Sequence, residues 1–162
     1  MYGMYPSEEV QKDKVPLKPA LGLKSFVTYV KELRPGEEIS YGGTYVTERT
    51  MRIATVAVGY GDGYPRSLSN CGYVLICGKR ARILGRVCMD QLMVDVTDIM
   101  EADVDTPVTL IGKDGDEEIT MEHLAELCGG FHYEMVCDIG KRVPRVYYRG
   151  GKVVGTMDCF AE

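Results

Sequence analysis

The chain contains a tyrosine, Tyr41, set between a serine and two glycines in the stretch SYGGTY (residues 40–45). A phenol hydroxyl can donate, accept or transfer a proton, so tyrosine is one of the side chains used for general acid–base chemistry. Glycines let the backbone bend and let another group approach closely. The stretch has two interpretations: a hairpin corner that carries a surface aromatic residue, or a tyrosine presented to a ligand.

A second stretch, VAVGYGDGYPR (residues 56–66), places Tyr60, Asp62 and Arg66 among glycines after a strand-like run. It lacks the glycine spacing and the following helix of a dinucleotide-binding fingerprint. A glycine-rich loop of this kind is either a plain turn or part of a site.

A third stretch, GRVCMDQ (residues 85–91), brackets Cys88 and Met89 with charged and amide side chains. A methionine at a strand end exposes its main-chain N–H as readily as its thioether. A nucleophilic thiol needs a nearby base, and neither histidine lies close in sequence, which disfavours a thiol enzyme. The stretch is therefore either a loop with a core methionine or a binding loop.

A fourth stretch, FHYEMVCDIGKRVPRVYY (residues 131–148), combines His132 and Tyr133 with acids and a basic segment. A histidine flanked by aromatic residues is more often a hydrogen-bonded structural residue than a general base. We expect a structural role for His132.

Composition limits the classes of function. The 162 residues, 45% hydrophobic and 27% charged, are typical of one globular domain with its own core. A net charge of −5 excludes nucleic acid as an expected partner. Six cysteines without a CxxC pair and two histidines outside any metal-ligand spacing predict free thiols and no metal site.

The expected location is the cytoplasm, without association with a membrane. No apolar run approaches the ~20 residues that span a bilayer. The first residues have neither the basic region nor the apolar stretch of a signal peptide.

The elements that position these stretches are predicted to be mainly short strands. Strand-like runs bounded by glycine turns occur at residues 21–33, 52–58, 73–87 (two strands divided at Cys77-Gly78-Lys79), 92–96, 107–111 and 146–156 (a hairpin). One helix is predicted after Thr120 as N-cap, ending at Gly129. This pattern predicts a mainly β fold, a β-barrel-like domain with one short α-helix.

Taken together, these segments resemble the C-terminal domain of alanine racemase, a fold-type III pyridoxal-phosphate enzyme. The resemblance rests on five motifs in the family's order: LRPGEEISYGGTY (33–45), VAVGYGDGYPR (56–66), LGRVCMDQLMVDV (84–96), VTLIG (108–112) and FHYEMVCDIGKRVPRVY (131–147). Each motif is weak alone, but five in order are highly specific.

The resemblance implies a larger protein in which an N-terminal (β/α)8 barrel holds the cofactor. Residues 1–17 are then expected to be a connector from that barrel, and residues 18–162 the C-terminal β domain. Met1 is accordingly expected to lie within a longer chain. None of the nine lysines of this sequence lies in the family's Schiff-base lysine motif.

The resemblance also implies roles for individual residues. Tyr41 matches the tyrosine that serves as one of two bases on opposite faces of the substrate α-carbon, the cofactor lysine being the other. Met89 matches the methionine whose main-chain N–H contacts the substrate carboxylate. Tyr60 matches an aromatic residue at the substrate entrance, and Tyr133 a tyrosine near the cofactor phosphate.

In the family, the catalytic tyrosine reaches the active site of the partner subunit of a head-to-tail dimer. A homodimer of the full-length protein is therefore expected. Arg66 and Arg86 resemble a charged layer outside the substrate entrance, although they could equally be solvated or ion-paired arginines.

The implied function is the interconversion of L-alanine and D-alanine by two-base proton transfer with pyridoxal phosphate, supplying D-alanine for cell-wall peptidoglycan. This isomerase activity is expected of the full-length protein, and the chain alone is expected to be inactive. Two alternatives stay open: a racemase of serine or of a broader set of amino acids, and a β domain that only binds or dimerises.

Overall fold

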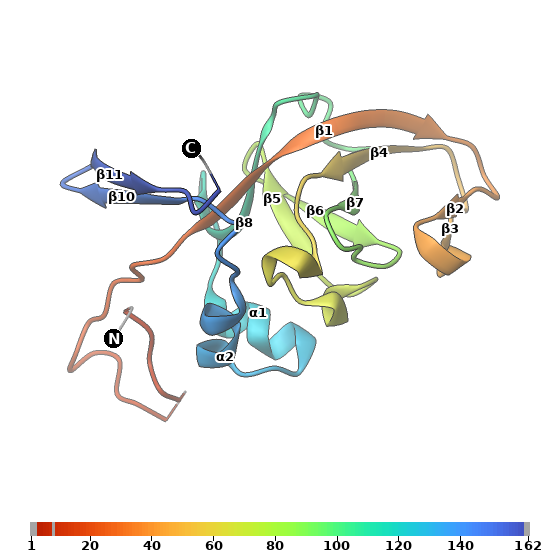
Figure 1. Ribbon diagram of the computed structural model, residues 1–162. Helices are drawn as coiled ribbons and strands as arrows, with labels where there is room; N and C mark the ends of the chain where they lie inside the picture. The colour runs from red at the N-terminus through yellow and green to blue at the C-terminus, as the bar shows by residue number, and fades with distance from the viewer. Residues whose placement is uncertain (1–2, 8, 161–162) are drawn as a thin grey trace.

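The structure is a computed structural model that describes residues 3–7 and 9–160 (Figure 1). The strands are β1 (Leu23–Leu33), β2 (Glu38–Ile39), β3 (Tyr45–Val46), β4 (Met51–Val56), β5 (Tyr73–Ile76), β6 (Lys79–Leu84), β7 (Leu92–Asp95), β8 (Pro107–Asp114), β9 (Glu117–Ile119), β10 (Arg145–Arg149) and β11 (Lys152–Met157). The α-helices are α1 (Met121–Cys128) and α2 (His132–Asp138), and three short 3₁₀ helices are η1 (Tyr41–Gly43), η2 (Tyr60–Asp62) and η3 (Arg66–Leu68).

Six strands close into a barrel because β1 pairs on both sides. The main sheet has the antiparallel order β1-β4-β7-β6-β5-β8-β9, and β1 also pairs with β8. Residues 23–26 of β1 pair with β8, and residues 27–33 pair with β4. The register shifts between Val27 and Tyr29, and such a bulge bends a strand and increases its twist. The prediction of a mainly β, barrel-like domain is confirmed.

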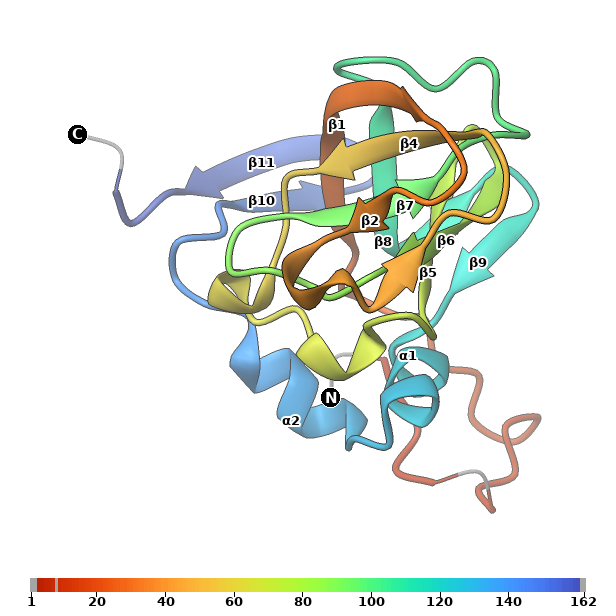
Figure 2. The ribbon, with the colours of Figure 1, turned by 90° about the vertical axis from the view of Figure 1, so that its right-hand side faces the viewer.

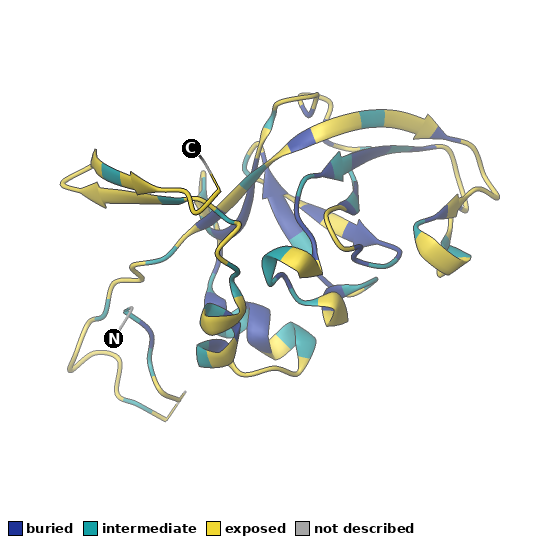
Figure 3. Ribbon diagram, in the orientation of Figure 1, coloured by how far each residue is buried: buried dark blue, intermediate teal, exposed yellow. Residues whose placement is uncertain are grey.

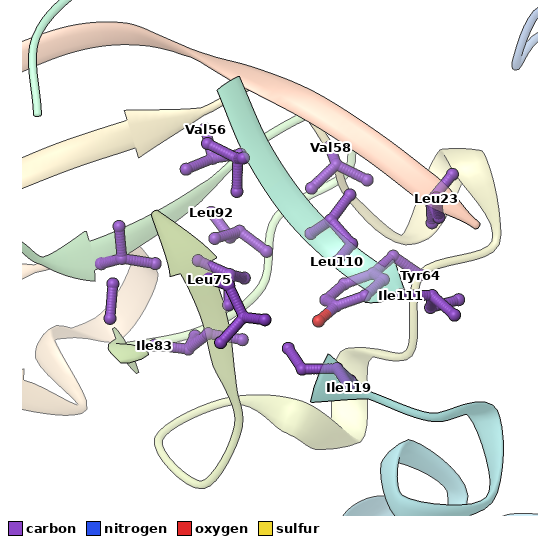
Figure 4. Close-up of a cluster of buried hydrophobic side chains, with 14 of the residues drawn as sticks. Leu23, Val56, Val58, Tyr64, Leu75, Ile83, Leu92, Leu110, Ile111 and Ile119 are labelled. Atoms are coloured by element: carbon purple, nitrogen blue, oxygen red, sulfur yellow. The ribbon is translucent and has the colours of Figure 1, made fainter. Parts of the chain in front are cut away.

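The barrel interior is filled by aliphatic side chains from all six strands (Figure 4). One fully buried residue from each strand shows this: Val27, Val56, Leu75, Ile83, Leu92 and Leu110. Burial of apolar surface at the packing density of protein interiors is the main favourable contribution to folding.

A smaller apolar cluster fixes the β2–β3 hairpin to the barrel. It consists of Leu33, Ile39, Met51, Ile53 and Leu84, all buried, and it joins β2 to the ends of β1, β4 and β6. Because Ile39 is only 3% exposed, the stretch that follows it is held close to β6. That stretch contains Tyr41.

Several local predictions are confirmed. Strands β5 and β6 are joined at Cys77 and Gly78, and β10 and β11 form the predicted hairpin. Helix α1 begins after Thr120, whose hydroxyl accepts a hydrogen bond from the main-chain N–H of His123, and it ends at Gly129 in the left-handed conformation.

The structure has two α-helices where the sequence pattern predicted one, so the predicted number was wrong. Helix α2 has seven residues and no side-chain cap at Phe131, its N-cap. Without a start signal, a helix this short is not stable alone. Burial of His132 and Met135 against the rest of the domain stabilises it. The two-residue strands β2 and β3 and the three-residue β9 were also not predicted.

The helices and the last hairpin lie on different parts of the barrel. Helices α1 and α2 lie together at one end (Figure 2). The β10–β11 hairpin extends away from the barrel and is exposed along most of both strands (Figure 3). The predicted connector, residues 1–17, has neither helix nor strand in its described part, residues 3–7 and 9–17.

Within residues 3–7 and 9–160, the helices are all too short to span a bilayer.

Candidate active site

Tyr41 lies at the tip of the β2–β3 hairpin, in η1, and its side chain is 72% exposed. The stretch was interpreted either as a hairpin corner with a surface aromatic residue or as a tyrosine presented to a ligand. An exposed tyrosine at the tip of a hairpin is compatible with both interpretations. The ring points to solvent from an element anchored by Ile39, so another molecule can reach it without a rearrangement of the core.

The two glycines after Tyr41 face side chains of this chain. A Cβ on Gly42 would lie 2.8 Å from a terminal guanidinium nitrogen of Arg86, and a Cβ on Gly43 would lie 2.5 Å from the Glu38 carboxylate. We expected these glycines to make room for an approaching ligand or partner. In the structure they make room for Arg86 and Glu38.

Met89 and Tyr60 lie on neighbouring loops that are joined through their main chains. The N–H of Tyr60 donates to the carbonyl of Cys88 at 3.0 Å, and the N–H of Gly61 donates to the carbonyl of Met89 at 2.8 Å. The side chains of Met89 and Tyr60 are 52% and 43% exposed. Among the described residues, the main-chain N–H of Met89 has no acceptor, so it is available to bind an anionic group.

Cys88 connects this pair of loops to the Tyr41 hairpin. Its thiol is buried, and the sulfur lies 3.3 Å from the hydroxyl oxygen of Ser40, the residue before Tyr41. Three of the predicted site residues, Tyr41, Tyr60 and Met89, are thus brought to one region of the surface.

Arg142 clamps the two loops together. Its guanidinium donates to Asp62 in η2 at 2.7 Å and to Asp90 beside Met89 at 2.6 Å. The hydrogen bond to Asp62, and then that to Asp90, raise the pKa of Arg142 above its ordinary value. Asp62 also accepts from the main-chain N–H of Gly59 at 2.9 Å, which closes the turn that presents Tyr60.

This clamp was not predicted from the sequence. Arg142 is 80 residues from Asp62 and 52 from Asp90, so no local spacing links the three. The sequence shows one carboxylate in each of two loops, Asp62 and Asp90, and a basic segment that contains Arg142. This pattern is too general to predict which arginine binds the two carboxylates.

Arg66 and Arg86 lie near these loops. Arg66 is exposed at the start of η3, and Arg86 is half-buried beside Gly42. Neither forms an ion pair with any residue that the structure describes.

Tyr133 lies on α2, a different element from the hairpin and loops that carry the other predicted residues. It is half-buried on α2, with its ring centroid 4.4 Å from that of His132 and 5.4 Å from that of Phe131. His132 is buried, as expected of a structural residue, but its Nε2 has no hydrogen-bond partner among the described residues.

The segment after α2 contacts η2, where the N–H of Gly140 donates to the carbonyl of Asp62 at 2.9 Å.

The surface near Tyr41 is open. A groove of about 350 Å³ adjoins the clamp, between the start of β1 and Arg142. Its lining includes none of Tyr41, Tyr60, Met89 and Tyr133. No group of three or more histidine, cysteine or acidic side chains that could hold a metal occurs within residues 3–7 and 9–160.

The chain is similar in sequence to curated alanine racemases. The sequence profile of the family "Alanine racemase, C-terminal domain" matches residues 20–147. Alanine racemase 1 of Clostridium acetobutylicum is 47% identical over 154 residues, which are 95% of this chain and 40% of the relative. The alanine racemase of Desulforamulus reducens is 51% identical over 147 residues, 91% of this chain and 39% of the relative.

Solved structures agree. The alanine racemase of Bacillus anthracis with bound L-Ala-P superposes with a TM-score of 0.90 at 44% identity, over 97% of this chain and 40% of that one. The Clostridium difficile enzyme in complex with cycloserine gives 0.90 at 39% identity, over 99% and 42%. The chain spans about two fifths of the length of the relatives it matches. In sequence and in fold, the chain belongs to the family of alanine racemase C-terminal domains.

Proposed function

We propose that the protein containing this chain interconverts L-alanine and D-alanine, with Tyr41 as one of two bases. The observation that carries the proposal is the position of Tyr41: a phenol 72% exposed at the tip of a hairpin that is itself packed on the barrel. A solvated phenol gains nothing for folding from this position, whereas a proton-transferring group must be both reachable and fixed.

Tyr60 and Met89 take the supporting roles. The main-chain N–H of Met89 binds the substrate carboxylate, and the ring of Tyr60 lines the entrance. Both loops are held by main-chain hydrogen bonds and by the clamp of Arg142. A rigid support of this kind keeps the carboxylate at a constant distance from Tyr41.

Pyridoxal phosphate is the proposed cofactor, and this chain fits a contact with it but not its covalent attachment. All nine lysines are exposed, whereas a lysine that forms a Schiff base needs a desolvated or cationic site that lowers its pKa. The phenol of Tyr133 is an uncharged donor suited to a phosphate oxygen. When bound, the cofactor takes up the electrons released as the α-hydrogen leaves.

The second base, which is the cofactor lysine, and the rest of the pocket are proposed to lie on polypeptide outside this chain. The Tyr41 surface is open, and transfer of an α-hydrogen requires a site that excludes water. A homodimer in which Tyr41 faces the partner subunit's pocket meets this requirement. The proposed location is the cytoplasm, the proposed product use is cell-wall synthesis, and the chain alone is proposed to be inactive.

The test is Tyr41→Phe in the full-length protein. We expect racemisation to fall by at least about 100-fold, the usual contribution of a general acid–base group. The second base stays in place, so one enantiomer of alanine should still exchange its α-hydrogen with deuterium from D₂O, while exchange of the other is lost. Proton NMR of each enantiomer follows exchange, and polarimetry follows racemisation.

The matched control is Tyr45→Phe, which removes a phenol from the same hairpin. Among the described residues, the only hydrogen bond of the Tyr45 hydroxyl is to the sulfur of Met51, at 3.8 Å. This variant should racemise alanine at the wild-type rate. Wild-type racemisation by Tyr41→Phe, or activity of the chain without the rest of the protein, would contradict the proposal.

A further inference from the structure

Ser40, which precedes Tyr41, has a backbone conformation that serine rarely adopts. Its φ is 66° and its ψ is −179°, a region populated almost only by glycine. Among the described residues, twelve glycines but only four other residues have positive φ, so the chain generally uses glycine where such a conformation is needed. A serine at this position indicates that its side chain has a use.

The hydroxyl of Ser40 holds the strained turn against the segment after β6. It donates to the main-chain carbonyl of Arg86 at 2.7 Å, and it lies 3.3 Å from the sulfur of Cys88. The contact is close enough to require glycine at position 85, where a Cβ would lie 2.5 Å from the carbonyl oxygen of Ile39. Backbone strain of this kind persists only where the surroundings enforce it.

The other side of the hairpin tip is tied to the same segment through Asn70. The amide nitrogen of Asn70 donates to the carbonyl and to the hydroxyl oxygen of Thr44, at 3.4 and 3.3 Å. Its amide oxygen accepts from the N–H of Gly85 at 2.7 Å. Tyr41 thus lies between two attachments, of which Ser40 provides the shorter.

The Ser40 attachment leads directly to the Met89 loop. Cys88 is the neighbour of Met89, and its carbonyl accepts the N–H of Tyr60. The contacts of the Ser40 hydroxyl therefore link the hairpin tip to the loop that is proposed to bind the substrate carboxylate.

We propose that Ser40 is a positioning residue whose hydroxyl sets the distance between the phenol of Tyr41 and the main-chain N–H of Met89. The inference rests on the proposed function, because it assigns Ser40 a part in proton transfer by Tyr41. Ser40 acts through Tyr41 and does not itself contact the substrate.

The experiment uses Ser40→Gly and Ser40→Ala in the full-length protein. Glycine adopts the observed backbone conformation without strain, so Ser40→Gly should fold while lacking the hydroxyl. We expect α-hydrogen exchange of the Tyr41-dependent enantiomer to slow by about 10-fold, since small misplacements of reacting groups have effects of this order or larger. Exchange of the other enantiomer, which depends on the second base, should stay at the wild-type rate. Ser40→Ala should show the same selective loss.

The control is Ser25→Ala, at a position in β1 away from the hairpin. The hydroxyl of Ser25 donates to the carbonyl of Ala57 at 2.8 Å, and the substitution removes this hydrogen bond. It should exchange both enantiomers at wild-type rates. Wild-type exchange of both enantiomers by Ser40→Gly, or equal losses for both, would overturn the inference. If Tyr41→Phe selectively loses exchange of one enantiomer and Ser40→Gly does not, only the inference about Ser40 fails. If neither variant shows this selective loss, the proposed function fails.

Discussion

At the scale of single residues, Tyr64 places a polar group in apolar surroundings. It is 2% exposed, and its hydroxyl has no hydrogen-bond partner among the described residues. Figure 4 shows the ring beside Leu110, Ile111 and Ile119. Burial, and to a smaller extent the thiols of Cys128 and Cys71 when ionised, raise the pKa of Tyr64 above that of an ordinary tyrosine. Such a hydroxyl lowers the stability of the fold.

Tyr64→Phe is accordingly expected to raise the free energy of unfolding by about 1 kcal/mol, because a buried hydroxyl without a partner costs about 1–3 kcal/mol. Urea denaturation at neutral pH measures the change. Tyr29→Phe, which alters a phenol exposed on β1, is the matched control and should leave stability unchanged. A loss of stability in Tyr64→Phe would show that the hydroxyl has a favourable partner.

The same residue predicts a dependence of stability on pH. The folded chain keeps the Tyr64 proton at a pH where the unfolded chain has lost it, because the folded pKa is raised. Titration of Tyr64 therefore leaves the free energy of unfolding unchanged below the unfolded tyrosine pKa of ~10 and lowers it as the pH rises above that value. Between pH ~9 and ~11, wild type should therefore lose more stability than Tyr64→Phe. Parallel curves of unfolding free energy against pH would contradict this.

At the scale of elements, the loops that carry Tyr60 and Met89 depend on a residue from a third segment. Arg142 follows α2, and it reaches back to Asp62 and Asp90. The main-chain hydrogen bonds between the loops are made by Tyr60 and Gly61, and these are the bonds that the clamp protects. The clamp therefore depends on a segment that follows α2, a helix that the sequence did not predict.

Arg142→Gln should loosen the two loops without unfolding the barrel. We expect amide hydrogen exchange of Tyr60 and Gly61 to become about 2- to 5-fold faster, a modest effect because the clamp is partly exposed to solvent. Hydrogen exchange followed by NMR measures it. Arg80→Gln removes another 2.7 Å ion pair, to Glu117, and should leave both amides unchanged. Equal protection in Arg142→Gln and wild type would mean that the main-chain bonds hold the loops alone.

At the scale of the whole molecule, the β10–β11 hairpin exposes several apolar side chains and has little of the domain to pack on. Tyr148, Val153 and Val154 are 67%, 55% and 59% exposed, and Figure 1 shows the hairpin extending from the barrel. Exposed apolar patches and strand edges tend to find partners.

The isolated chain is therefore expected to self-associate through this hairpin. Sedimentation velocity should show a sedimentation coefficient that rises with concentration, and Tyr148→Ser should reduce the rise. Tyr29→Ser, at an exposed position on β1, should leave it unchanged. A single monomeric species at high concentration would contradict the prediction.

Elements with local signals follow from the amino-acid sequence. Glycines at the turns, β-branched residues in the runs, and Thr120 and Gly129 at the ends of α1 all act over a few residues, so the main strands and one helix were predictable. The motifs around Tyr41, Tyr60, Met89 and Tyr133, taken together in their order, likewise identify the family without the structure, because residue types at fixed spacings are a property of the chain alone.

How these elements meet depends on contacts formed in the folded chain. Closure of the barrel pairs Phe26 with Pro107, helix α2 is stable only in its packed position, and the strain at Ser40 is sustained by contacts with residues 85–88. The tertiary structure also placed Tyr133 on a helix that the sequence did not predict. These features depend on packing and hydrogen bonds between residues far apart in the chain, which no local pattern of residue types encodes.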